Sequence, residues 1–171
     1  MVQKLEWFKR EFVFDLEAWM FANIVERLRG TPARCAELTS RFEEARLTMR
    51  PEGKWSIQEN IGHLLDLEPL WFARAEDILQ GKTELRPADL TNRKTHETNH
   101  NARSFAAILG EFRSARTDLI AILENVGERD ILRSALHPRL KQPMRLLDLA
   151  FFVAEHDDHH LAAASETGYR I

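Results

Sequence analysis

The sequence predicts an all-α protein, a four-helix bundle with a long crossover between its second and third helices. Apolar residues recur every three or four positions along several stretches, which is the spacing of one helix face. Polar segments marked by glycine and proline separate these stretches, and no segment shows a convincing strand pattern. A chain of 171 residues suits one domain over residues 1–171, which is long enough to bury a core.

The first part of the chain predicts two short helices. Residues 16–29 are expected to form a helix that ends at Gly30. Thr31 and Pro32 are expected to begin the next helix, which runs to about Arg46, because threonine is a good N-cap and proline suits the first helical position.

The second long helix has a strong start signal. Ser56 and Glu59 have the spacing of a capping box, and Trp55 precedes them, where an apolar side chain can pack on the first turn. This helix is expected to run to about Gln80 and to end at Gly81.

The rest of the chain predicts a crossover and two further helices. A polar connection covers residues 82–100, and the third helix is expected from Asn101 to a stop at Gly127. A loop containing His137 follows, and Pro143 is expected to open the fourth helix, which runs to about Glu166.

The composition excludes several classes of protein. A net charge of −3 argues against binding nucleic acid by phosphate neutralisation. The single cysteine, Cys35, excludes a disulfide framework and fits a packing role in a reducing compartment, so we expect a cytoplasmic protein. The most apolar stretch, residues 146–154, is short and contains Asp148, so no membrane segment is expected.

A histidine pair on the fourth helix predicts a metal site. His156 and His160 are four residues apart and share a face with Leu149 and Val153, which should point into the bundle. Buried imidazoles need partners, and a metal ion would satisfy both, although two core histidines bonded to other side chains are the alternative. His159 points to the side of this face and is expected at its rim.

His63 on the second helix is the candidate third ligand. Asp66, one turn further on, could orient its ring, and three histidines with an open position form a catalytic arrangement. His63 lies near the start of its helix and the pair lies near the end of the other. The three reach one level only if these helices are antiparallel, which a crossover at residues 82–100 allows.

A second pair, His96 and His100, matches the H-E-x-x-H pattern of zinc proteases. Its neighbours are all polar, so we expect a solvated loop, or a loop that borders a site built elsewhere. A di-iron site needs two Glu-x-x-His motifs, and only Glu97 with His100 matches, which rejects that class.

The Trp55-Ser56-x-x-Glu59-x-x-x-His63-x-x-Asp66-x-Glu68 segment, with the later His156-x-x-x-His160, resembles the DinB/YfiT-like superfamily. The resemblance implies a four-helix bundle that holds one divalent transition metal, nickel or zinc, and forms a homodimer. Carried over, the metal ligands are His63, His156 and His160.

The resemblance also implies an activity. Members of that superfamily include transferases of low-molecular-weight thiols, a thiol-dependent maleylpyruvate isomerase, and proteins described only as metal-dependent hydrolases. We expect a metal-dependent enzyme that transfers a small thiol to an electrophilic small-molecule substrate. A hydrolase of a small amide or ester and a non-catalytic metal-binding stress protein are the alternatives. Asp66, Asp157 and Asp158 are the expected catalytic acids, and Glu68 is either a core acceptor or a carboxylate near the cavity.

Overall fold

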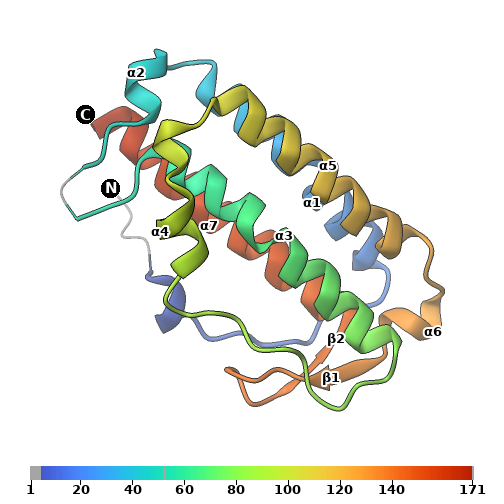
Figure 1. Ribbon diagram of the computed structural model, residues 1–171. Helices are drawn as coiled ribbons and strands as arrows, with labels where there is room; N and C mark the ends of the chain where they lie inside the picture. The colour runs from blue at the N-terminus through green and yellow to red at the C-terminus, as the bar shows by residue number, and fades with distance from the viewer. Residues whose placement is uncertain (1–4, 52, 171) are drawn as a thin grey trace.

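The computed structural model describes residues 5–51 and 53–170 (Figure 1). Within them the long helices are α1 (Met20–Thr39), α3 (Ile57–Leu79), α5 (Phe105–Glu124) and α7 (Leu146–Arg170). The short element η1 (Trp7–Lys9) precedes α1, and the other short elements lie between the long helices: α2 (Glu44–Leu47), α4 (Arg93–Thr98), η2 (His100–Ala102), α6 (Glu128–Ile131), β1 (Ser134–Leu136) and β2 (Pro143–Arg145). The predicted helical-bundle class is confirmed. None of the described helices is long and apolar enough to cross a bilayer.

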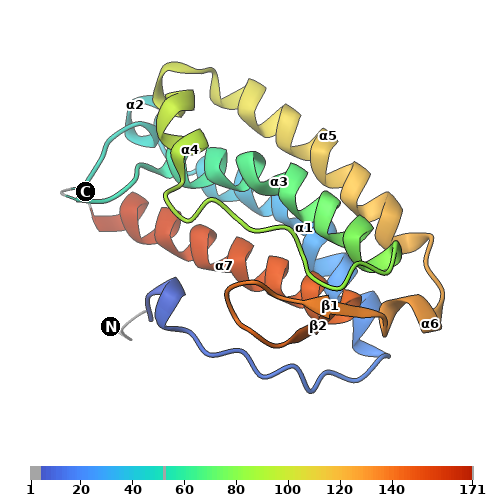
Figure 2. The ribbon, with the colours of Figure 1, turned by 60° about the horizontal axis from the view of Figure 1, so that its bottom comes forward.

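The connection after α3 sets the topology of the bundle. It runs back along the bundle through α4, so that α3 and α5 are parallel while α7 runs in the opposite direction (Figures 1 and 2). Ser56 Oγ donates to Asn101 Oδ1 at 2.7 Å, which brings the starts of α3 and α5 together. Lys54 pairs with Glu166 at 3.5 Å, which places the end of α7 beside the start of α3. The predicted crossover is therefore confirmed.

The predicted break at Gly30 is wrong, because α1 continues through Pro32. A proline inside a helix leaves the carbonyl four residues earlier without its N–H partner. Here that carbonyl belongs to Leu28, and Arg116 Nη1 from α5 donates to it at 3.0 Å. Thr31 is not an N-cap, since its hydroxyl contacts Arg27 O at 3.3 Å and Asp157 Oδ2 at 2.7 Å. Contacts with Arg116 and Asp157 from other helices therefore keep α1 continuous where the local sequence predicts a stop.

Two later boundaries also differ from the prediction. The sequence predicts no strand, yet β1 and β2 form an antiparallel hairpin in which Ala135 pairs with Met144. Pro143 therefore opens a strand, and α7 begins at Leu146 and extends to Arg170. Burial of Ala135 and Met144 between the hairpin and the bundle favours the strands.

The start and end signals of α3 are confirmed. Ser56 accepts from the backbone N–H of Glu59, and the Glu59 carboxylate accepts from that of Ser56. Gly81 follows the helix with φ of +74°, a conformation that glycine adopts without strain.

Cys35 is fully buried in an apolar cluster, which raises its pKa to about 12 and fits the predicted packing role.

Candidate metal centre

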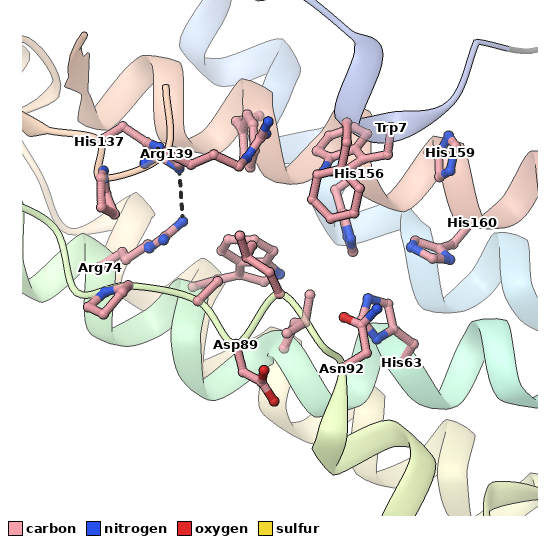
Figure 3. A pocket seen from close by; sticks show the side chains of 18 of the residues that line it. Trp7, His63, Arg74, Asp89, Asn92, His137, Arg139, His156, His159 and His160 are labelled. Carbon is pink, nitrogen blue, oxygen red and sulfur yellow. Dashed lines mark hydrogen bonds between the residues drawn. The ribbon is translucent and has the colours of Figure 1, made fainter. Parts of the chain in front are cut away.

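The three predicted histidine ligands come together between α3 and α7 (Figure 3). One ring nitrogen from each of His63, His156 and His160 lies within 4.8 Å of the others. His63 and His156 are buried, and His160 is half-buried. The spacing of four residues places His156 and His160 on one face of α7. The crossover brings His63, 97 residues before His160, to the same level of the bundle.

Second partners fix the orientation of two of these rings. His160 Nδ1 lies 2.9 Å from Asn60 Oδ1, and the Asn60 amide nitrogen donates to Ser56 O at 2.8 Å. The Asn60 oxygen therefore faces His160 as an acceptor, so Nδ1 of His160 carries the hydrogen and Nε2 carries the lone pair. Such partners fix the tautomer of a metal-binding histidine.

His63 is oriented through a threonine. Its Nδ1 lies 2.9 Å from Thr95 Oγ1, and that hydroxyl donates to Asp66 Oδ2 at 2.9 Å. Because the hydroxyl hydrogen goes to Asp66, Nδ1 of His63 donates to Thr95, and Nε2 carries the lone pair. Asp66 thus acts on His63 through Thr95, where the sequence predicted direct contact. Its role as a catalytic acid stays a prediction.

His156 supplies a test of whether these residues fit a metal ion. Its Nδ1 is buried and has no hydrogen-bond partner among the described residues. The ring is enclosed by Trp7 at 5.0 Å and Trp71 at 5.5 Å, measured between ring centres. Burial lowers the pKa of His156 well below its ordinary value and that of His63 to about 4. These imidazoles are neutral near pH 7, as metal binding requires, so the set fits a divalent transition ion.

The H-E-x-x-H segment does not form a zinc-protease helix. Asn99 adopts a left-handed conformation with φ of 49°, which ends α4 at Thr98 and separates the two histidines. His96 is exposed and lies against Trp55, at 5.8 Å between ring centres. His100 is fully buried, and its Nε2 lies 2.8 Å from Asp66 Oδ2. The expectation of a solvated loop is wrong for His100, whereas the expectation of a loop bordering the site is right.

A glycine makes room for this buried histidine. A Cβ placed on Gly62 would overlap the His100 ring, so only glycine at this position lets the ring reach Asp66.

Asn60 and Thr95 were missed by the sequence reasoning. Asn60 lies three residues before His63, a helical spacing that could have indicated it, whereas nothing local marks Thr95.

The other two predicted acids contact arginines. Asp157 is fully buried and accepts from Arg116 Nη1 at 2.6 Å and from Thr31. Asp158 pairs with Arg27 and Arg34. Their catalytic role stays a prediction, and these contacts show them engaged with arginines.

Glu68 takes the role of a core acceptor, which was one of its two predicted roles. It accepts from Arg116 Nη2 at 2.6 Å and from Nε at 3.0 Å. Its burial raises the pKa of Glu68 to about 7, against the lowering effect of Arg116.

A cavity of about 660 Å³ adjoins the three histidines (Figure 3). Its walls are mainly aromatic and apolar. Trp55, just before α3, lies beside His63 at 4.9 Å and stacks on His160 at 5.9 Å between ring centres. His159 lines the wall beside Trp7. The far end of the cavity carries a separate polar group: Arg74, His137 and Arg139.

The fold and the histidine centre define a class of four-helix-bundle proteins with a three-histidine candidate metal site. Residues 27–164 match the DinB superfamily, and the chain belongs to that family.

Two relatives are similar over most of their length. A Bacillus pumilus (strain SAFR-032) protein named "Putative metal-dependent hydrolase" is 25% identical over 154 residues, which covers 89% of this chain and 84% of that protein. The solved structure of YfiT from Bacillus subtilis, described as a probable metal-dependent hydrolase with an unusual four-helix bundle topology, superposes with a TM-score of 0.80. That match has 19% identity and covers 94% of this chain and 93% of the other, so it supports the fold.

Proposed function

We propose that this chain is a metal-dependent enzyme that transfers a low-molecular-weight thiol to an electrophilic small molecule. His63, His156 and His160 would hold one divalent transition ion, with nickel and zinc as the expected metals. The observation that carries the proposal is the opening of this histidine centre onto a large aromatic-lined cavity. Such a cavity can hold a second reactant beside the centre.

The charges of the site favour an anionic nucleophile. Three neutral imidazoles would leave a divalent ion its full charge, and when bound the ion supplies a Lewis acid that favours the thiolate over the thiol. Among the described lining residues, the carboxylates are those of Glu6 and Asp89, and both residues are exposed. Asp66, the acid nearest to His63 along α3, is engaged by Thr95 and His100, and this supports a thiol over a water molecule that needs a base.

The protein's own groups would orient the reactants and exclude water. Asn60 and Thr95 hold two rings in the tautomer that presents Nε2. Trp7, Trp55 and Trp71 form apolar walls next to the centre. In the overall reaction the thiol releases its proton to water and its sulfur bonds to the electrophilic carbon. The leaving group then departs with the electron pair of the bond that breaks.

Hydrolysis of a small amide or ester is the second candidate. It is favoured by the printed descriptions of the two relatives, which both name a metal-dependent hydrolase. Here water would replace the thiol as the nucleophile.

The test compares thiol transfer with hydrolysis on the nickel- and zinc-loaded protein. Glutathione, cysteine, bacillithiol and mycothiol are each assayed with chlorodinitrobenzene, and p-nitrophenyl acetate and an aryl amide are assayed without thiol. The expected result is thiol-dependent conjugation that falls about 100-fold in His160→Ala and is unchanged in His96→Ala. The cobalt-substituted protein should also change its absorption spectrum when the active thiol is added.

Two results would overturn the proposal. Metal-dependent ester or amide cleavage, with no thiol changing the cobalt spectrum, would establish the hydrolase. A metal-loaded protein that turns over neither set would indicate the non-catalytic metal-binding alternative.

A further inference from the structure

A buried arginine without a carboxylate partner lies at the far end of the cavity. Arg74 on α3 is 2% exposed, and its Nε donates to Arg86 O at 3.0 Å. It forms no salt bridge with any described residue. The nearest candidate, Asp77, is instead held by Arg86 through two contacts of 2.7 and 2.9 Å. Asp77 acts on Arg74 only through its charge and not through a contact, so the guanidinium lines the cavity without a direct ion-pair partner among the described residues, which is costly for a buried cation.

A second arginine approaches the same place from the turn between β1 and β2. Arg139 is half-buried beside the Phe8 ring, with its guanidinium carbon 5.4 Å from the ring centre. Its Nη2 is buried and has no hydrogen-bond partner in the described part of the chain. Burial, and after it the positive charge of Arg139, lowers the pKa of Arg74 to about 10.

His137 lies between the two arginines, and its Nε2 faces no hydrogen-bond acceptor among the described residues. Its Nδ1 accepts from the backbone N–H groups of Arg139 and Leu140 at 3.2 and 3.1 Å. Burial and the two arginines lower the pKa of His137 to about 3, so the ring is neutral near pH 7. A neutral ring that accepts at Nδ1 carries its hydrogen on Nε2. Nε2 lies 3.2 Å from Arg74 Nη1, so two donors face each other (Figure 3).

We propose that Arg74, Arg139 and His137 form a binding subsite for an oxyanion of the substrate, a carboxylate or a phosphate. An oxyanion there would accept from both guanidinium groups and from Nε2–H of His137, which supplies the missing acceptor. The acids that line the cavity leave this position open. Asp89 is exposed and accepts from Thr91 and the Arg93 backbone, and Glu6 pairs with Lys9.

The position of the subsite limits the length of the substrate. The Arg74 guanidinium carbon is 5.6 Å from the Trp71 ring centre, which is 5.5 Å from the His156 ring centre. The guanidinium is therefore at most about 11 Å from that imidazole, the sum of the two distances. Assigning the anion to the substrate rests on the proposed function. The inferred substrate is an acidic small molecule whose anionic group can reach Arg74 while its reacting atom lies beside the histidine centre, a span limited by this distance of about 11 Å.

The test measures binding of small anions directly, without turnover. Glutarate, inorganic phosphate and the neutral analogue glutaramide are titrated into the metal-loaded protein, with calorimetry and the fluorescence of the cavity tryptophans as readouts. One or both anions should bind, and Arg139→Gln should weaken that binding about tenfold or more. Because the Arg139 guanidinium makes no hydrogen bond to described residues, this variant should keep the melting temperature of wild type. Tighter binding of glutarate or of phosphate identifies which oxyanion the subsite takes.

Two controls separate this inference from the proposed function. Arg133→Gln removes an exposed arginine just before the same hairpin, paired with Asp130, and should leave anion binding unchanged. His160→Ala should lower thiol transfer about 100-fold yet still bind the anion, so a failure of the proposed chemistry leaves the subsite testable. Equal anion binding by wild type and Arg139→Gln, or equal binding of glutaramide, would overturn the subsite.

Discussion

Replacing Arg116 by methionine should destabilise the bundle more than any exposed arginine replacement. Arg116 is 1% exposed and lies where α1, α3, α5 and α7 meet. It donates to Glu68 on α3, to Asp157 on α7 and to the Leu28 carbonyl on α1. Methionine fills a similar volume but leaves two buried carboxylates without their cation.

The size of the effect follows from these contacts. Removing one partner of a buried ion pair costs about 3–5 kcal/mol, because the remaining charge stays buried and unpaired. Glu68 can take up a proton near neutral pH, since its pKa is raised to about 7, which reduces the number of unpaired charges to one. We therefore expect a loss of about 3 kcal/mol in the free energy of unfolding at pH 7, or about 6–12 °C in melting temperature.

The penalty should also depend on pH in a defined direction. The pKa of Glu68 is raised in the folded protein, so folding favours its protonated form, and stability is lost as pH rises from its ordinary value of 4.5 towards 7. Without Arg116 this pKa should rise further, because the arginine lowers it. The penalty of Arg116→Met should therefore be larger at pH 8 than at pH 6.

Urea unfolding followed by circular dichroism at pH 6, 7 and 8 measures both quantities. Arg113→Met, an exposed position on the same helix, is the matched control and should change the free energy of unfolding by less than about 0.5 kcal/mol. A loss below about 1 kcal/mol for Arg116→Met, or a penalty that does not change with pH, would refute the reasoning.

Three further outcomes test other parts of the structure. Gly62→Ala should displace the His100 ring and lower the free energy of unfolding by about 1–3 kcal/mol, and wild-type stability of this variant would contradict the packing at that position. His156→Ala should reduce bound nickel or zinc, measured by elemental analysis, at least tenfold, while His96→Ala should retain it; the reverse pattern would move the metal site to the second pair. Wild type should lose stability relative to His137→Gln as the pH falls from 6.5 towards 3, by up to about 1.4 kcal/mol per pH unit. The reason is that the unfolded ring binds a proton in this range, whereas the folded ring, with its pKa of about 3, stays neutral. A pH-independent difference in urea unfolding would contradict this assignment.

The histidine centre was largely predictable because it depends on helical periodicity. His156 and His160 share one face of any helix that contains them, and the apolar residues of that face indicate its direction. His63 was proposed from its place on the second long helix, one turn before Asp66, and the crossover was then inferred because it brings the start of α3 to the level of the end of α7. The partners of these rings could not be found in this way, since Thr95 reaches His63 from a separate short helix.

The sequence alone determined the features that depend on neighbours a few residues apart. The capping box of Ser56 and Glu59 and the stop at Gly81 need only local hydrogen bonds and one backbone angle. The tertiary structure decided the features in which distant groups replace a local partner. Helix α1 continues through Pro32 because Arg116, 84 positions further along the chain, donates to the carbonyl that the proline leaves without a partner. Arg74 and Arg139 likewise come together only because the hairpin packs against α3. The local sequence shows which polar groups lack a nearby partner, but it does not show which distant group will reach them.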